Sequence, residues 1–237
     1  MEIIPVIDLK GGTVVHARMG RRDDYRPIRT PLSATSDPVD VARGLLSVHP
    51  FTTLYVADLD AIERRDDNRA ALGRLKAVFP HLTLWVDNGI ARLDQAEKWL
   101  DAGVGHLVLG SESQTGAALV RRFAKDPRVV LSLDFRGPAF QGPHELLEDT
   151  AAWPGKIIAM TLARVGSGAG PDMDVLARIR DAGAPQMIYV AGGVRGAADL
   201  AALARAGIAG ALIASCLHDG RLTGAEIETY AANGCLT

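Results

Sequence analysis

The sequence has little of what marks secreted or membrane-spanning proteins. Its 237 residues include two cysteines, Cys216 and Cys235, whose spacing fits no paired motif, so we expect reduced thiols and no disulfide framework. No apolar run approaches the ~18 residues that a membrane helix needs, and the first residues lack the basic and apolar regions of a secretory signal. We therefore expect a cytoplasmic protein with no membrane partner.

An excess of charge of one sign is also missing. With 26 Lys and Arg against 28 Asp and Glu, the net charge of −2 argues against a nucleic acid partner, although it leaves room for a small anion bound locally. The patterns HExxH, CxxC, GxSxG and GxxxxGKS/T are absent, which removes the usual support for zinc peptidases, thiol-redox proteins, serine hydrolases and P-loop proteins. The scattered histidines form no ligand set, so we expect no metal and no cofactor: His16, His49, His81, His106, His144 and His218.

Short apolar segments rich in β-branched residues recur along the chain, with helix-like segments between them. Each is apolar throughout instead of alternating, which is typical of parallel strands covered on both faces. The candidate strands are residues 3–8, 53–58, 82–87, 106–110, 128–134, 156–161, 186–193 and 210–215. They predict an α/β fold, a (β/α)8 TIM barrel in which residues 1–237 form one domain. A doubly wound open sheet is the alternative.

The segments between the candidate strands carry helical periodicity with Ala, Leu, Arg and Glu. Five of them are clear: residues 37–48, 69–79, 92–103, 115–126 and 173–183. Two end in Asp-Ala-Gly, where Gly103 and Gly183 suit a left-handed C-cap before the next strand.

The chain also contains an internal repeat. Residues 86–111 align without gaps on residues 190–215, with identical glycines and serines at equivalent predicted strand ends. Residues 131–138 likewise match residues 5–12. We therefore expect two half-barrels of four βα units each, at about residues 1–125 and 126–237.

Two aspartates occupy equivalent places in this repeat. Asp8 ends the first candidate strand and Asp134 ends the fifth. The first and fifth strands face each other across an eight-stranded barrel, and catalytic groups of this fold lie at the carboxyl ends of strands. Two opposed carboxylates can divide general acid and base roles when their environments separate their pKa values. The alternative is a pair of solvated or salt-bridged strand-end aspartates.

Two pairs of glycine and serine motifs predict anion sites. "DNGIA" (87–91) is followed by "LGSES" (109–113), and "AGGVR" (191–195) by "IASCL" (213–217). Glycine lets a backbone approach closely, and N–H groups and a hydroxyl after a strand can hold a phosphate. The repeat thus predicts two phosphate sites on opposite sides of the barrel mouth, the first weakened by its aspartate. Glycines needed only for tight turns are the alternative.

Two loops are candidates for ligand contact. Residues 161–172 form a long Gly/Ser segment after the sixth candidate strand, which fits either a lid or a plain connection. Residues 19–38 carry four arginines that fit either an anion clamp or a solvated charged stretch: Arg21, Arg22, Arg26 and Arg29.

Together these motifs resemble the HisA/HisF family of histidine-biosynthesis barrels. "IPVIDLKGGTVV", "LYVADLDAI", "SLDFRG" and "VAGGVRG" occur in the family's order, and the resemblance runs from residue 1 to about residue 220. It implies Amadori isomerisation of a phosphorylated aminoaldose to an aminoketose, with Asp8 and Asp134 as the acid/base pair and Thr161 as a further catalytic residue. It implies phosphate contacts from Gly89, Gly110, Ser111, Gly192, Gly193 and Ser215, and other pocket contacts from Lys10, Asp58, Asp87 and Arg195.

Several positions depart from the family pattern. Tyr55 stands where HisA proteins commonly carry a histidine in the second strand, and "DNGIA" replaces Gly-Gly-Gly-Ile-Arg after the third. After the sixth strand the Asp-Gly-Thr loop is missing, and Ala214-Ser215 replaces Gly-Arg after the eighth. The acid/base pair is retained, while much of the pocket lining differs.

These departures favour a HisA-like paralogue that acts outside histidine synthesis on a related phosphorylated ribose-amine compound. Family members in organisms that use tetrahydromethanopterin for one-carbon transfer are one such group. A genuine HisA isomerase and a non-catalytic phosphosugar-binding barrel are the alternatives. In each case we expect a small phosphorylated ligand as the partner, and the oligomeric state is left open.

Overall fold

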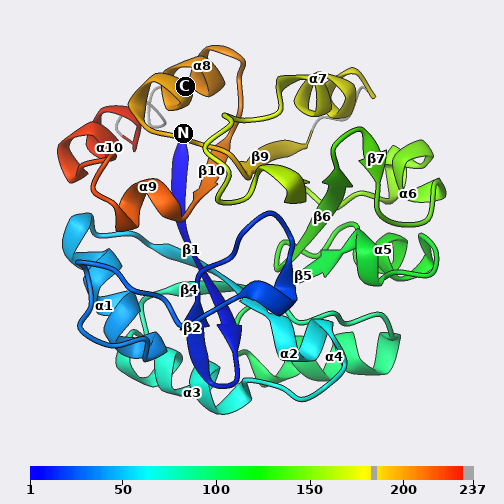
Figure 1. Cartoon of the computed structure of the whole chain (residues 1–237). Coiled ribbons are helices and arrows are strands. Elements are labelled where there is room, and N and C mark those ends of the chain that lie inside the picture. Colours follow the sequence, from blue (N-terminus) through cyan, green and yellow to red (C-terminus); the bar gives the residue numbers. More distant parts are fainter. Residues whose placement is uncertain (183–185, 232–237) are drawn as a thin grey trace.

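The computed structural model describes residues 1–182 and 186–231, and eight parallel strands form a closed ring at its centre (Figure 1). The last strand of the ring pairs with the first. In order around the ring, the strands are Glu2–Lys10 (β1), Thr53–Asp58 (β3), Thr83–Asp87 (β4), His106–Gly110 (β5), Val129–Arg136 (β6), Lys156–Thr161 (β8), Met187–Ala191 (β9) and Gly210–Ile213 (β10). The predicted (β/α)8 TIM barrel is confirmed, and the open sheet is excluded.

Helices cover the outside of the ring (Figure 1). The longer ones are Pro38–Val48 (α1), Arg69–Val78 (α3), Leu93–Ala102 (α4), Ala118–Arg122 (α5), Met173–Asp181 (α7), Ala197–Arg205 (α8) and Gly224–Ala231 (α10). Single turns are Leu59–Ile62 (α2), Glu145–Glu148 (α6) and Ser215–His218 (α9), with 3-10 turns at Arg22–Asp24 (η1), Ser111–Ser113 (η2), Thr150–Ala152 (η3) and Leu162–Arg164 (η4). All five predicted helical segments contain a helix.

Local sequence explains where these helices begin and end. Asp37 caps α1 by accepting a hydrogen bond from Val39 N at 2.9 Å, and Pro38 opens the helix, where its missing N–H costs nothing. Gly103 ends α4 in the left-handed conformation, with φ of +63°, as predicted. Gly183, the second predicted C-cap, lies outside the described residues.

Strand side chains alternate between two apolar layers. On β1, Ile3 and Ile7 pack outward with the helices, whereas Ile4 points into the barrel. Inside the barrel the rings of Trp85 and Tyr189 meet edge to face, with centroids 5.0 Å apart. Because both faces of each strand are buried, the strand segments had to be apolar throughout.

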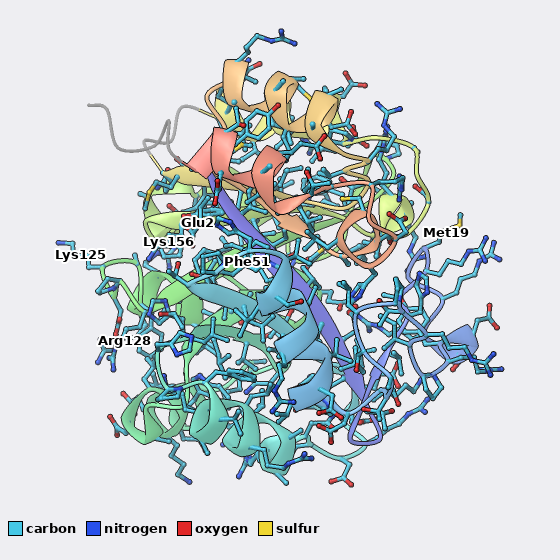
Figure 2. The ribbon with its side chains drawn as sticks, turned by 90° about the vertical axis from the view of Figure 1, so that its left-hand side faces the viewer. Glu2, Met19, Phe51, Lys125, Arg128 and Lys156 are labelled. Carbon is cyan, nitrogen blue, oxygen red and sulfur yellow. The ribbon has the colours of Figure 1, made fainter. Side chains whose placement is uncertain are left out.

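The amino end of the barrel is closed by polar contacts around Glu2. Its carboxylate accepts hydrogen bonds from Tyr189 Oη at 3.0 Å and Thr53 Oγ1 at 2.8 Å. Figure 2 shows Glu2 at the end of the molecule opposite to Met19, which belongs to the loop between β1 and α1. These contacts fill the amino end of the barrel with side chains of β1, β3 and β9.

The half-barrel repeat is visible in the structure. A short antiparallel strand, Thr13–Val15 (β2), follows β1, and another, Ala139–Phe140 (β7), follows the equivalent β6. Gly89 and Gly193, which match in the repeat, both have positive φ, at +67° and +91°. These two features recur at equivalent places of the ring, and the division into half-barrels near residue 125 stays a prediction.

Candidate active site

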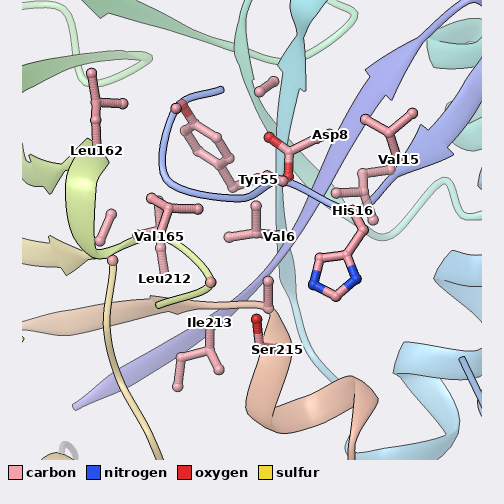
Figure 3. Close-up of a pocket in the computed structure, with 18 of the residues that line it drawn as sticks. Val6, Asp8, Val15, His16, Tyr55, Leu162, Val165, Leu212, Ile213 and Ser215 are labelled. Atoms are coloured by element: carbon pink, nitrogen blue, oxygen red, sulfur yellow. The ribbon is translucent and has the colours of Figure 1, made fainter. Parts of the chain in front are cut away.

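The carboxyl ends of the strands surround a cavity of about 360 Å³ (Figure 3). Inward-facing strand residues such as Val6, Tyr55 and Leu212 form its inner surface, and the loops after β1, β8, β9 and β10 form its walls. The volume is at the small end of the ~300–1,000 Å³ typical of ligand pockets.

Asp8 lies in this cavity, near the end of β1 (Figure 3). Within the described part of the chain, no hydrogen bond reaches its carboxylate. Burial raises the pKa of Asp8 to about 7, and the charge of Arg22 offsets part of that rise. A carboxyl group with a pKa near neutrality can carry a proton to a substrate.

Asp134 lines the cavity from β6, which is opposite β1 in the ring. Ser132 Oγ donates a hydrogen bond to Oδ1 at 2.7 Å, and Ser111 Oγ and Glu112 N donate to Oδ2 at 3.1 and 3.2 Å. Burial and the charge of Glu112 raise the pKa of Asp134 to about 6, and these hydrogen bonds limit the rise because they favour the ionised form. Asp134 therefore ionises more readily than Asp8.

The repeat explains why the two aspartates differ. Val6 occupies in β1 the place of Ser132 in β6, so Asp8 lacks that donor. Ser215 corresponds to Ser111, but its hydroxyl makes no hydrogen bond to any described residue. Asp8 and Ser215 therefore make no hydrogen bond to each other, whereas the equivalent Asp134 and Ser111 do.

Asp87, at the end of β4, brings a third carboxylate into the cavity. It is 6% exposed and accepts one hydrogen bond, from Gly89 N to Oδ1 at 3.1 Å. Burial and the charge of Asp134 raise the pKa of Asp87 to about 8. Tyr55 lies near the same carboxylates. Its burial and the charges of Asp87, Asp134 and Asp8 hold the pKa of its phenol well above the usual value.

Gly192, Gly193 and Ser215 line the cavity, and their contact with a phosphate stays a prediction. Both glycines have positive φ, at +98° and +91°. A Cβ on Gly192 would press on the carbonyl oxygen of Thr161, and one on Gly193 on that of Gly170. Only glycine fits this turn, which leaves its backbone open to a ligand.

Basic side chains gather near these residues. Figure 3 shows His16 beside Ser215, on the side of the cavity away from Tyr55. Burial and the charge of His16 lower the pKa of His218 to about 4, and His218 Nδ1 lies 3.1 Å from Thr30 Oγ1. Two arginines also line the cavity here, Arg221 with an ion pair to Asp219 and Arg29 with none to any described residue.

The equivalent residues of the first half-barrel, Gly89, Gly110 and Ser111, are not among those that line the cavity. Ser111 is fully buried and donates hydrogen bonds to Asp134 and to Gln141 O, at 3.1 and 2.7 Å. Gly110 lies against Asp87, whose Oδ2 would be 2.8 Å from an added Cβ. Their role in phosphate binding stays a prediction, and the observed contacts of Ser111 position Asp134.

The loop between β2 and α1 crosses the mouth of the cavity. Arg22, in η1, forms an ion pair with Glu112 after β5. Lys10 Nζ donates a hydrogen bond to Arg22 O at 2.8 Å, so Lys10 supports this loop and does not line the cavity. Of the four arginines in the loop, Arg22 and Arg29 line the cavity, whereas Arg21 and Arg26 do not.

The loop after β8 forms another wall, through Leu162, Val165, Gly166 and Gly168. Val165 O accepts a hydrogen bond from Met19 N at 2.8 Å, which joins this loop to the one after β2. Arg164 pairs with Asp172 at 3.1 Å and donates to carbonyl oxygens of the same loop. Whether residues 162–172 open as a lid stays a prediction.

Three further predicted residues lie outside the cavity lining. Thr161 is 2% exposed, and its carbonyl oxygen lies under Gly192. Asp58 is 1% exposed and accepts hydrogen bonds from Ala61 N and from the backbone and side chain of Asn68. Arg195 turns away to pair with Asp199 at 2.7 Å. Contact of these three residues with a ligand stays a prediction.

Sequence reasoning missed Glu112 and Tyr25, which also line the cavity. Glu112 directly follows the predicted Ser111, so its position carried a usable signal. Tyr25 carried none, because only the path of the loop brings it near Asp8. Burial and the charge of Asp8 raise the pKa of Tyr25 to about 12.

No group of three or more His, Cys, Asp or Glu side chains is arranged to hold a metal ion in residues 1–182 and 186–231. Over the same residues, no helix has the length and apolar character to cross a membrane. Of the two cysteines, Cys216 is a buried free thiol, and Cys235 lies outside the described residues.

Comparison with known proteins gives a family model and curated relatives. The model described as "Histidine biosynthesis protein" matches residues 2–223. An uncharacterized protein of Methanocaldococcus jannaschii is 28% identical over 96% of this chain and 97% of its own length. The 1-(5-phosphoribosyl)-5-((5-phosphoribosylamino)methylideneamino) imidazole-4-carboxamide isomerase of Hyphomonas neptunium is 31% identical over 94% of this chain and 96% of its own. The Thermus thermophilus protein of that name is 30% identical, with the same coverage. The chain belongs to the histidine-biosynthesis protein family.

Proposed function

We propose that this protein is a cofactor-free isomerase of the HisA type, which converts a phosphorylated ribose-amine compound from its aminoaldose to its aminoketose form. The observation that carries the proposal is the placement of Asp8 and Asp134 on opposite strands of one cavity, with pKa values of about 7 and 6. Such a pair can exchange protons with a substrate held between them near neutral pH.

The two aspartates take different roles in this reaction. Asp8, the weaker acid of the two, donates a proton to the ring oxygen of the aminoaldose as the C1–O bond breaks. Asp134, held ionised by Ser111, Ser132 and Glu112 N, removes the C2 proton from the resulting iminium ion. The enaminol that forms takes up a proton at C1 as its oxygen loses one, which gives the aminoketose.

The phosphate of the substrate binds on the side of Gly192, Gly193 and Ser215. The free Ser215 hydroxyl and the open backbone of the two glycines supply donors, and Arg29 supplies an unpaired positive charge. Arg22 and Glu112 restrict the mouth on the opposite side.

The printed name of the related isomerases describes a compound with two phosphoribosyl groups. Tyr55 and "DNGIA" depart from the HisA pattern, and Glu112 brings negative charge and Asp87 a further carboxyl group to the first half-barrel. These differences favour a substrate other than that compound and a role outside histidine synthesis. Work in tetrahydromethanopterin-linked one-carbon metabolism is the specific form of this proposal, and the neighbouring genes test it.

Exchange of the substrate C2 proton with solvent tests the proposed reaction. Candidate ribose-amine phosphates are incubated with the protein in D2O, and deuterium at C2 is followed by NMR. We expect exchange with the wild type, at least a ~100-fold loss with Asp8→Asn or Asp134→Asn, and no change with Asp94→Asn, which alters a surface carboxylate paired with Arg92.

Full activity in the Asp8→Asn, Asp134→Asn double variant overturns the proposal. Restored growth of a histidine auxotroph that lacks the isomerase identifies the chain as a genuine HisA instead.

A further inference from the structure

The two sides of the cavity differ in the ionisable side chains that border them. The side near Tyr55 is bordered by Asp8, Asp87, Glu112 and Asp134. The side near Ser215 is bordered by His16, by Arg29 and by Arg221, which is paired with Asp219. His218 also lies here and is neutral near pH 7, because its pKa is lowered to about 4. Two cations stand near the acidic side: Arg22, paired with Glu112, and Arg136, at the exposed rim against Gly20.

Two polar atoms on the acidic side make no hydrogen bond to any described residue. Tyr55 is 3% exposed, yet its hydroxyl makes no hydrogen bond to any described residue. Asp87 is 6% exposed, and its only hydrogen bond is to Oδ1, which leaves Oδ2 free. Both residues line the cavity, where water can reach these two atoms in the free protein. A ligand that fills the cavity displaces that water, so it must contact both atoms or leave them without a hydrogen bond.

A second phosphate does not suit this side. The donors that the repeat places here, Ser111 Oγ and Glu112 N, are already bonded to Asp134. A phosphate would also meet the carboxylates of Glu112 and Asp134, and like charges at close range are costly. In the second half-barrel the equivalent Ser215 hydroxyl is free, so one anion site remains.

We propose that the natural ligand carries one phosphate, bound at Gly192, Gly193 and Ser215, and at its other end a protonated amine that contacts Asp87 Oδ2 and Tyr55 Oη. This amine is separate from the C1 nitrogen, which must keep its lone pair to form the iminium ion. This inference rests on the proposed function, because it takes the phosphate site from it, and it specifies the substrate class. A cavity of about 360 Å³ fits a single sugar phosphate of this kind.

An ammonium group can supply hydrogen bonds to both atoms on the acidic side that have none. It has three donors and no acceptor, so it can bond Asp87 Oδ2 and the oxygen of Tyr55. Its positive charge also favours the ionised form of Asp87, whose pKa is raised to about 8 in the free protein. Binding of an amine phosphate near pH 7 should therefore release a proton from Asp87.

Calorimetry with three probes tests the proposal. Glucosamine 6-phosphate carries an amine and one phosphate, glucose 6-phosphate is its neutral counterpart, and fructose 1,6-bisphosphate carries two phosphates. We expect glucosamine 6-phosphate to bind about tenfold more tightly than glucose 6-phosphate, and the bisphosphate to bind most weakly. Titrations in buffers of different ionisation enthalpy should show more proton release for the amine than for its neutral counterpart.

Two variants locate the two ends of the ligand. Asp87→Asn should bring glucosamine 6-phosphate to the affinity of glucose 6-phosphate, and Ser215→Ala should weaken both probes equally. Tightest binding of the bisphosphate, or an amine preference that survives Asp87→Asn, overturns the inference while leaving the isomerase proposal intact. If Asp87→Asn does not fold, the order of the three probes on the wild type still decides. Failure of all three probes to bind removes the phosphate site, and with it both proposals.

Discussion

Ser111 and Asp134 exchange two hydrogen bonds: Ser111 Oγ donates to Asp134 Oδ2 at 3.1 Å, and Asp134 N donates to Ser111 Oγ at 2.9 Å. The pair joins the end of β5 to β6 and holds the carboxylate at the wall of the cavity. The equivalent pair, Ser215 after β10 and Asp8 on the neighbouring β1, makes neither bond. Two identical pairs of residues therefore behave differently in one barrel.

Replacement of Ser111 by alanine should raise the pKa of Asp134, because the ionised carboxylate loses a donor. We expect the acidic limb of the kcat/KM profile to move up by about one pH unit. The free energy of unfolding should fall by about 1–3 kcal/mol, since Asp134 N and Gln141 O lose their partner. Ser113→Ala is the control, and an unmoved acidic limb would contradict this role.

The pH dependence of activity should be bell-shaped and narrow. Activity requires ionised Asp134 and protonated Asp8, and their pKa values are about 6 and 7. The optimum of kcat/KM should therefore lie between these values, and the two limbs belong to the pair because the groups titrate in one cavity. Activity that keeps rising above pH 8 would argue against Asp8 as the acid.

Replacement of Val6 by threonine tests the origin of the difference between the aspartates. A hydroxyl at this position would stand where Ser132 stands in the other half-barrel and could donate to Asp8. We expect a lower pKa for Asp8 and a basic limb of kcat/KM that moves down by about one pH unit. Val6→Ala removes the methyl groups without adding a donor, so it should leave the basic limb in place.

Stability should fall as the pH rises from 6.5 to 8.5. Folding raises the pKa of Asp8 and Asp87 from 3.8 to about 7 and about 8, so their contribution is complete below the unfolded value and is lost as pH passes the folded values. We expect a loss of roughly 2–3 kcal/mol. The lowered pKa of His218 acts in the opposite direction, between about 4 and 6.5, outside this window.

Chemical denaturation across this pH range measures the effect. Asp87→Asn should remove most of the slope, since Asp87 has the higher pKa of the two. An unchanged slope in this variant would show that other groups cause it.

Two glycines separate backbone strain from close contact. Gly193 and Gly207 both have positive φ, at +91° and +73°, but only Gly193 has a neighbour, Gly170 O, where a Cβ would lie. Gly207→Ala should cost about 1 kcal/mol. Gly193→Ala should cost about 3 kcal/mol and weaken phosphate binding, because the loop after β8 must move. Equal costs in urea denaturation would show that Gly170 gives way freely.

The barrel was predictable because its evidence is local. Each strand segment is apolar throughout because both of its faces are buried, and this pattern can be read from the segment alone. Asp8 and Asp134 lie on opposite strands because the first and fifth strands of any closed ring of eight are opposite each other. The bonding of Ser111 was not predictable from its motif, since Ser215 has the same motif and stays free. That difference depends on Ser132 against Val6 and on loops that meet only in the folded chain.

The same limit applies to charged residues near the mouth. Asp58 and Asp87 both end strands, yet Asp58 bonds to the following turn and Asn68, whereas Asp87 faces the cavity. Arg22 and Arg21 are adjacent, but only Arg22 lines the cavity, through the turn of η1. The direction of a charged side chain at the mouth depends on its hydrogen-bond and ion-pair partners. Because many of these partners are distant in the sequence, the direction could not be predicted from the local sequence.

The unequal sides of the mouth have a consequence for how a molecule enters it. A barrel of two equivalent halves would accept an elongated ligand in two orientations related by a half-turn, and only one of them would place C1 and C2 correctly. Here Val6 in place of Ser132, and the free Ser215 in place of the bonded Ser111, make the halves unequal. Every encounter then favours a single orientation, so fewer complexes form that must dissociate without reacting.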